Sequence, residues 1–164
     1  DIGFDLYPKN KIKIQGNRII YTYNSSHTTC YGAPILSRNK YSSGIHTLRI
    51  KLVEGVFHCC VSGIGICSKK SEDMLSGAKS LSTSHGSTRT SFGDIYYYGY
   101  PSWGNNNRWE VGEIVSIKLD CTNSKILITK NNVTLLDTSI KKQPYYFVIC
   151  PADCNRTKTI YKIL

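Results

Sequence analysis

Two apolar runs between residues 109 and 136 constrain the fold more than any other part of the sequence. In the first run Val115, Ile117 and Leu119 alternate with polar residues. This period of two gives a strand one apolar face and one polar face. A polar, turn-forming stretch follows, and then a second apolar run from Ile126 to Ile128. The two runs and the turn between them predict a β-hairpin, which is the unit of an antiparallel sheet.

Short strand-like segments recur along the rest of the chain, at intervals of about ten residues. Gly16-Asn17 is a two-residue turn between two apolar runs and predicts another hairpin. Residues 45–53 alternate as well, so we expect the even-numbered residues from His46 to Leu52 to face the core. Acidic residues and an N-cap residue precede Met74 to Lys79, which predicts at most one short helical turn. The sequence therefore predicts an all-β protein, an antiparallel β-sandwich of two sheets.

The length of 164 residues is that of one domain with a self-sufficient core. We expect residues 1–10 to be an irregular lead-in segment and residues 11–164 to form the single sandwich domain, excised from a longer chain. Residues 145–149 and 157–164 are predicted as the last two strands, which close the sheet. No run approaches the roughly eighteen apolar residues of a membrane span.

Between residues 112 and 136 the chain has Gly112-Glu113, Asp120, Ile128 and Asn131-Asn132, in that order around the predicted hairpin. This stretch resembles the SPRY domain. That family has, at the same spacing, a Gly-Asp pair opening a strand that ends in Asp, then a hairpin, an aromatic residue where this chain has Ile128, and Asn-Gly before a short apolar strand. Asn also adopts positive φ with little strain, so Asn132 can replace the glycine.

The resemblance extends in the family's order from Lys11 to the C-terminus. Residues 41–52 are similar to the strand that usually reads Gly-x-x-Tyr-Trp-Glu-Val, although the aromatic pair is missing. Residues 60–67 are similar to the strand with Val-Gly-Val, and residues 143–149 to the strand that begins with Tyr-Pro. The resemblance implies two curved antiparallel sheets packed face to face, as in concanavalin A-like folds.

Seven cysteines are present, in an odd number and without any Cys-x-x-Cys spacing. Most lie in apolar runs, which indicates reduced, buried thiols and a cytoplasmic protein. Three Asn-x-Ser/Thr sequons, at Asn24, Asn132 and Asn155, point toward secretion instead, but a chain rich in Asn, Ser and Thr produces such sites by chance.

The formal net charge of +10 suggests a nucleic-acid partner. The basic residues are dispersed along the sequence, however, with no run longer than pairs such as Lys69-Lys70. No nucleic-acid-binding motif accompanies them. We therefore expect a solvated basic surface and no nucleic acid as partner.

The patterns of catalytic and metal-binding residues are missing from the sequence. Glu110 and Glu113 are the one closely spaced pair of carboxylates beside a predicted strand, and three residues apart on a strand they would face opposite sides, as charges at the rim. His58 and Cys59 would likewise point to opposite faces of a strand. Calcium-loop, zinc-site and dinucleotide-binding spacings are not met. We expect no enzyme, no catalytic residue, no metal and no cofactor.

Binding of another protein or a peptide is the function that the SPRY resemblance implies. Such domains bind through loops at one end of the sandwich and act as the targeting part, or adaptor, of a larger chain, often one connected with ubiquitin ligation. By motif position, the segments implied here are Thr29–Arg38, Ser68–Leu75, Tyr98–Trp109 and Pro151–Arg156. The candidate partner-binding residues are Tyr31, Arg38, Tyr100, Trp103 and Asp153. Tyr, Trp and Arg dominate binding hot spots.

Each candidate also has a purely structural interpretation. Tyr31, Tyr100 and Trp103 would then cover the edge of the core, and Arg38 and Asp153 would be solvated surface charges. The tryptophan that usually lines the family's pocket near the final loop is replaced here by the region of Asp153 and Cys154, which puts any shared ligand motif in question.

A carbohydrate-binding, lectin-like sandwich is the alternative function. The aromatic-rich stretch from Tyr96 to Trp109 could stack against a sugar ring. Lectins of this kind usually carry a polar cluster on a concave strand face, of the His-Asn-Arg sort, and the sequence does not indicate one. We therefore favour a monomeric protein-interaction module.

Overall fold

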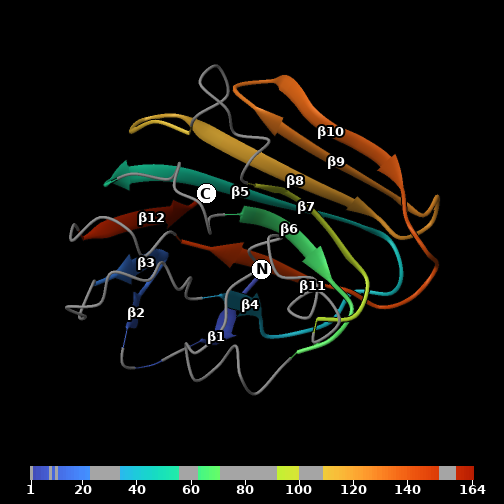
Figure 1. Cartoon of the computed structure of the whole chain (residues 1–164), viewed down its shortest axis with the longest axis horizontal. Helices are drawn as coiled ribbons and strands as arrows, with labels where there is room; N and C mark the ends of the chain where they lie inside the picture. Colours follow the sequence, from blue (N-terminus) through green and yellow to red (C-terminus); the bar gives the residue numbers. More distant parts are fainter. Residues whose placement is uncertain are drawn as a thin grey trace.

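The computed structural model describes residues 2–7, 9, 11–22, 34–55, 63–70, 92–99, 109–151 and 158–164, which form twelve β-strands and no helix (Figure 1). The strands are β1 Phe4–Leu6, β2 Ile12–Gln15, β3 Arg18–Tyr21, β4 Ile35–Ser37, β5 Ile45–Glu54, β6 Gly63–Cys67, β7 Ile95–Gly99, β8 Ile114–Asp120, β9 Lys125–Lys130, β10 Val133–Ser139, β11 Tyr146–Cys150 and β12 Thr159–Ile163. Among these residues there is no helix that could cross a membrane. The predicted helical turn at Met74 to Lys79 lies outside the described residues.

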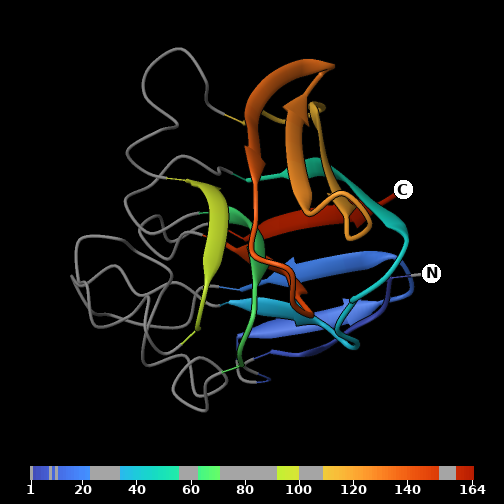
Figure 2. The same ribbon diagram turned by 90° about the vertical axis from the view of Figure 1, so that its right-hand side faces the viewer.

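The strands form two antiparallel sheets, which confirms the predicted all-β sandwich. The five-stranded sheet has the order β1-β4-β11-β6-β7, and the seven-stranded sheet has the order β10-β9-β8-β5-β12-β3-β2. In Figure 2, β6 and β7 lie to the left of β3 and β12, so the two layers are seen apart. The main core cluster contains buried side chains from both sheets.

The predicted hairpin is β8 and β9, which pair in register from Val115 opposite Lys130 to Asp120 opposite Lys125. The alternating residues of β8 are fully buried, as their period of two predicts. Asn131 and Asn132 form the next turn, with φ of 47° and 67°. Asparagine tolerates this left-handed backbone region better than most residues, so the chain can turn here without glycine.

β5 also follows its sequence pattern. Leu48, Ile50 and Leu52 have exposed fractions of 1% or less, whereas His46 at the start of the same face is only half-buried. The His46 ring lies 4.4 Å from the ring of Tyr41, centroid to centroid. A partly exposed first residue is expected where a strand emerges from the sandwich.

The three inner strands of the five-stranded sheet, β4, β11 and β6, are buried on both faces. Ile35 and Ile149 belong to the main core, whereas Leu36 and Val148, which point to the other face, belong to a second cluster of buried residues. The apolar runs of β4 and β11 are therefore continuous rather than alternating, as in strands that are covered on both sides.

Two expectations about the ends of the chain differ from the structure. The segment 1–10, expected to be an irregular lead-in, contributes β1 to the five-stranded sheet, and Phe4 is buried. The three residues of β1 are too few to show an alternation of apolar and polar side chains, so the sequence pattern does not indicate this strand. The last two strands do not close one sheet, because β11 lies inside the five-stranded sheet and β12 inside the seven-stranded sheet.

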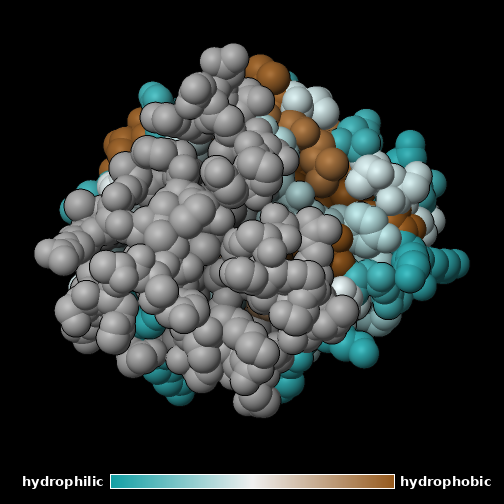
Figure 3. Space-filling view, in the orientation of Figure 1, coloured by the Kyte–Doolittle hydropathy of each residue, from teal (hydrophilic) through white to brown (hydrophobic). Residues whose placement is uncertain are grey.

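Space-filling atoms of the described residues show mixed character on the face seen in Figure 3. Hydrophobic and hydrophilic residues both reach the surface at the upper right, where β9 and β10 lie in Figure 1. Val133 at the start of β10 is 63% exposed. Single exposed apolar residues of this kind are ordinary on a protein surface.

Candidate functional site

One end of the sandwich is where the chain repeatedly crosses between the two sheets. β1, β3, β5, β7 and β11 finish at this end, and β2, β4, β6, β8 and β12 begin there. The register places Cys150 opposite Gly63, and Gly63 opposite Gly99, in one sheet. In the other sheet Thr159 lies opposite Tyr21. We call this the crossover end, and the opposite end of the same strands the far end.

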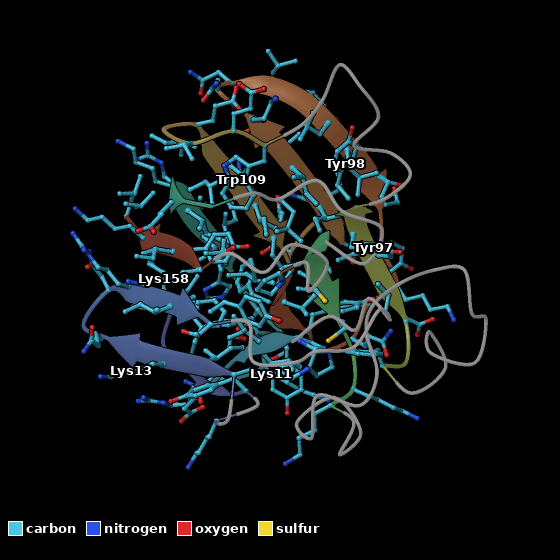
Figure 4. All side chains as sticks on the ribbon, turned by 60° about the vertical axis from the view of Figure 1, so that its left-hand side comes forward. Lys11, Lys13, Tyr97, Tyr98, Trp109 and Lys158 are labelled. Atoms are coloured by element: carbon cyan, nitrogen blue, oxygen red, sulfur yellow. The ribbon has the colours of Figure 1, made fainter. Side chains whose placement is uncertain are left out.

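Four of the five predicted contact residues, Tyr31, Tyr100, Trp103 and Asp153, lie outside the described residues. The described residues that bound their segments are Thr22 and Pro34, Gly99 and Trp109, and Pro151 and Lys158. All six border the crossover end, because each adjoins a strand that finishes or begins there. Figure 4 labels Lys11, Tyr98, Trp109 and Lys158 around this side of the molecule.

Arg38 lies at the far end, one residue beyond β4. Its Nε donates a hydrogen bond to Asp5 Oδ2 at 2.8 Å, and its backbone N–H donates to the carbonyl of Gly3 at 2.7 Å. The Arg38 side chain is 63% exposed, so this ion pair adds little stability. The predicted segment Ser68–Leu75 also starts at the far end, where β6 finishes. The structure therefore does not bring Arg38 or Ser68 together with the boundaries of the other segments.

Trp109 anchors the chain where it enters β8 at the crossover end. Its side chain is fully buried, and its ring lies 5.5 Å from the ring of Tyr161 on β12. The indole Nε1 donates a hydrogen bond to the carbonyl of Glu113 at 3.0 Å. A buried tryptophan needs such a partner for its N–H. Trp109 thus fixes the boundary of the segment that contains Trp103.

Glu113 holds the turn before β8 to the turn between β9 and β10. Its carboxylate accepts hydrogen bonds from the backbone N–H of Glu110 at 2.8 Å and from Asn131 Nδ2 at 3.1 Å, and it lies 3.2 Å from Lys130 Nζ. The prediction that Glu110 and Glu113 face opposite sides of a strand is wrong. Both precede β8, in a turn closed by a hydrogen bond from the Glu113 N–H to the Glu110 carbonyl.

A polar groove lies on the outer face of the seven-stranded sheet, and no sequence pattern indicates it. It has a volume of about 380 Å³ and is lined by Arg49, Ile114, Ser116, Thr129, Asn131 and Asn132. These residues come from β5, β8, β9 and the following turn, so only the pairing of the strands brings them together. No aromatic side chain is among these lining residues.

A hydrogen-bonded network joins β7 to the connection before β11 at the far end. Gln143 Nε2 donates to Asp94 Oδ2 at 2.7 Å and to the Tyr145 hydroxyl at 3.1 Å, and that hydroxyl donates to the carbonyl of Lys141 at 2.8 Å. The hydrogen bonds from Gln143 and Lys141 hold the pKa of Asp94 below its ordinary value. The network is a structural tie between two loops.

Cys67, Cys121 and Cys150 are buried thiols that form no disulfide, in agreement with the expectation for these three. Burial raises the pKa of Cys67 to about 12, so its thiol stays protonated at neutral pH. The other four cysteines, and the His58-Cys59 pair, lie outside the described residues. Within the described ranges no three His, Cys, Asp or Glu side chains are grouped so that they could hold a metal ion.

Comparison with solved structures identifies the fold of this chain, whereas comparison of sequences finds no match. No protein-family profile matches the sequence, and neither does any curated protein. Among solved structures, the neuralized NHR1 domain of Drosophila melanogaster is 13% identical with a TM-score of 0.61, covering 99% of this chain and 97% of that one. The SPRY domain of human HERC1 is 12% identical with a TM-score of 0.56, covering 98% and 96%. The PSpry domain of TRIM65 is 9% identical with a TM-score of 0.54, covering 100% and 92%. These similarities show that the chain has the fold of a divergent SPRY-like domain.

Proposed function

We propose that this domain is a non-catalytic protein-interaction module that binds a peptide or protein surface at its crossover end. The observation that carries the proposal is the convergence of six segment boundaries there. Tyr31, Tyr100, Trp103 and Asp153 belong to segments that start and finish at this end. Loops held by a rigid scaffold are the usual place for recognition residues, because the core does not need their side chains.

Rigid support at the boundaries favours this end over the far end. Tyr21, Trp109 and Cys150 are fully buried where their strands meet the crossover end. Anchoring of this kind lowers the entropy lost when a partner binds. Arg38 is kept as a separate candidate at the far end, since its ion pair with Asp5 leaves most of the Arg38 side chain exposed.

The likeness to SPRY domains supports a wider proposal, that the module is the targeting part of a larger chain, such as one connected with ubiquitin ligation. We place the protein in the cytoplasm, and the absence of a disulfide at Cys67, Cys121 and Cys150 is consistent with a reducing compartment. We further propose that the domain acts as a monomer and needs no cofactor.

The test starts with capture of partners by the full chain and identification by mass spectrometry. Trp103→Ala should then weaken binding of the captured partner by about 2 kcal/mol or more, as hot-spot aromatics do. The melting temperature of the Trp103→Ala variant should stay close to that of the unchanged protein. Lys118→Ala, on an exposed position of β8, is the control and should change affinity and stability by less than about 0.5 kcal/mol.

Two outcomes would contradict the proposal. If Trp103→Ala costs about 3 kcal/mol or more of folding stability, Trp103 is a lid on the core rather than a contact. If Trp103→Ala leaves affinity intact and Lys118→Ala weakens it, the partner binds the face of the sheet. Arg38→Ala, measured beside them, tests whether the far end contributes.

Carbohydrate binding is the second candidate, and the polar groove beside Arg49 is the observation that favours it. Its hydroxyl and amide groups, from Ser116, Thr129 and Asn132, could bond to sugar hydroxyls. The groove lacks an aromatic lining on which a sugar ring could stack, so we rank it second. Calorimetric titration with a panel of oligosaccharides, repeated on Thr129→Val, would detect such a site.

A further inference from the structure

Three basic residues lie side by side across three neighbouring strands of the seven-stranded sheet. Arg18 on β3 is directly opposite Lys162 on β12, and Lys162 is directly opposite Lys51 on β5. All three point away from the core, because a residue adjacent to each in its strand is buried: Ile19 beside Arg18, Tyr161 beside Lys162 and Leu52 beside Lys51. Neighbouring strands are about 4.8 Å apart, so the three backbone positions span only about 10 Å.

Two further basic residues extend this row. Arg49 lies two positions before Lys51 on the same face of β5, and Lys13 on β2 is opposite Ile20, two positions after Arg18. We call the five residues the basic band: Lys13, Arg18, Arg49, Lys51 and Lys162. None of them forms an ion pair with another residue in the part of the chain that the structure describes.

Acidic residues are sparse on the same face of these strands. Glu54 is the one described carboxylate there; it ends β5, where a shift of register places it opposite Ile160 at the crossover end, beyond the row. The remaining described residues that point outward from β2, β3, β5 and β12 are uncharged: Gln15, Ile20, Ile45, Thr47, Val53 and Ile160.

The other half of the sheet carries charges of both signs on its outer face. Lys118 and Lys125 there share their surface with Asp120 and Asp137. Positive charge is therefore concentrated on one half of the outer face.

The row is unfavourable for the isolated domain, because like charges directly opposite each other on a sheet repel. At about 0.1 M salt the screening length is about 10 Å, comparable with the whole row, so salt does not remove the repulsion. Packing of Tyr161 and Leu52 beneath the row holds the strands in this register. A bound anion would be attracted to all three basic residues and would offset their mutual repulsion, so the band favours an anionic partner.

An extended acidic peptide fits the band better than other anions. Arg49 and Lys51 are separated by two strand residues, about 6.7 Å, which equals the separation of alternate side chains in an extended peptide. Arg49 also borders the polar groove, where Ser116 and Thr129 offer hydroxyl groups to a peptide backbone. No aromatic side chain is among the described outward residues of these strands, so stacking of nucleic-acid bases has no platform there.

We propose that the basic band of Lys13, Arg18, Arg49, Lys51 and Lys162 is a second interaction surface, which binds an extended acidic segment of a protein. This surface is separate from the crossover end and does not depend on the partner bound there. The acidic segment carries carboxylates at alternate positions, facing the guanidinium and ammonium groups of the band.

The probe for this surface is a fluorescein-labelled peptide of alternating Glu and Ser, about twelve residues long in keeping with the strand spacing. Fluorescence anisotropy with the full chain should show saturable binding at about 50 mM salt that weakens strongly by about 300 mM. A matched peptide of alternating Gln and Ser should not bind. The variant with Arg18→Gln, Lys51→Gln and Lys162→Gln should bind the acidic peptide about tenfold more weakly or worse.

A control of equal charge separates the band from net charge. Lys118→Gln, Lys125→Gln and Lys142→Gln change three exposed lysines elsewhere, so both triple variants fall from +10 to +7. The control should keep peptide affinity within about twofold, as should Trp103→Ala. Circular dichroism melts of each variant establish that it is folded.

Three results would overturn the proposal. Equal weakening by both triple variants would mean that only net charge matters. Failure of the acidic peptide to bind at low salt would remove the surface altogether. Tighter binding of a DNA duplex or of phosphatidylserine vesicles than of the peptide, lost in the band variant, would assign the band to phosphate groups instead of an acidic segment.

Discussion

Replacing Trp109 by alanine should destabilise the fold more than a change at any proposed contact residue. The side chain is fully buried and packs on Tyr161, so its removal loses burial and leaves a cavity. Substitutions of this kind cost about 3 to 5 kcal/mol. The lost hydrogen bond adds little, because the Glu113 carbonyl also accepts the N–H of Leu52 at 3.2 Å. We therefore expect a loss of about 4 kcal/mol in the free energy of unfolding, near the middle of the range for a large side chain removed from a core.

Urea denaturation followed by circular dichroism measures this loss, with the slope in urea unchanged. For a domain of this size about 4 kcal/mol corresponds to a fall of about 8 to 16 °C in melting temperature. Trp109→Phe, which keeps most of the apolar volume, should lose only about 1 to 2 kcal/mol. A loss below about 1.5 kcal/mol for Trp109→Ala would refute the argument that this side chain is a core anchor of the crossover end.

Three further predictions concern packing, thiols and pH. Gly65→Ala should cost about 3 kcal/mol or more in urea denaturation, because a Cβ there would lie 2.6 Å from Tyr97 Cα; a cost below about 1 kcal/mol would contradict this close approach. Titration of the native protein with a thiol reagent near neutral pH should leave Cys67 unmodified, since burial raises its pKa to about 12, and denaturation without reductant should release all seven thiols; mass spectrometry would reveal a failure of either. The pKa of Asp94 is lowered, chiefly by the hydrogen bond from Gln143. The ionised Asp94 carboxylate therefore stabilises the fold above the ordinary carboxyl pKa, and this stabilisation is lost as the pH falls through the lowered pKa. Melts of Asp94→Asn should accordingly show a smaller loss of stability in acid than melts of the unchanged protein.

The parts of the fold that the sequence predicts well are those decided by neighbours along the chain. The alternation of Val115, Ile117 and Leu119 identifies the buried face of β8, because side-chain direction in a strand depends only on position. The turn at Asn131-Asn132 is equally local, since it depends on which residues tolerate positive φ. The resemblance to SPRY domains rests on the same local features, and the solved structures agree with it.

Features that depend on pairing between distant strands do not follow from the sequence. β1 has only three residues, and its place beside β4 is set by the fold around it. Spacing alone indicates that Glu113 is a charge at the rim, yet its carboxylate connects Glu110 with Asn131, which lies eighteen residues after Glu113. Motif position groups Arg38 with the other candidates, although β4 separates it from the crossover end. Periodicity gives the direction of a side chain but not its neighbours across the sheet.

The basic band shows most clearly that the sequence does not reveal which residues are neighbours across a sheet. Along the sequence Arg18, Lys51 and Lys162 are separated by 33 and 111 residues, so their charges look dispersed and indicate only a solvated surface. Strand order and register place them directly opposite one another, and one shift of register would turn Lys162 into the core and Tyr161 out of it. The burial of Tyr161 therefore fixes the position of the charge beside it. It follows that removing the middle charge, Lys162→Gln, should raise the free energy of unfolding slightly at low salt and leave it unchanged at high salt, as urea denaturation at the two salt concentrations would measure; a change that did not depend on salt would contradict repulsion within the row.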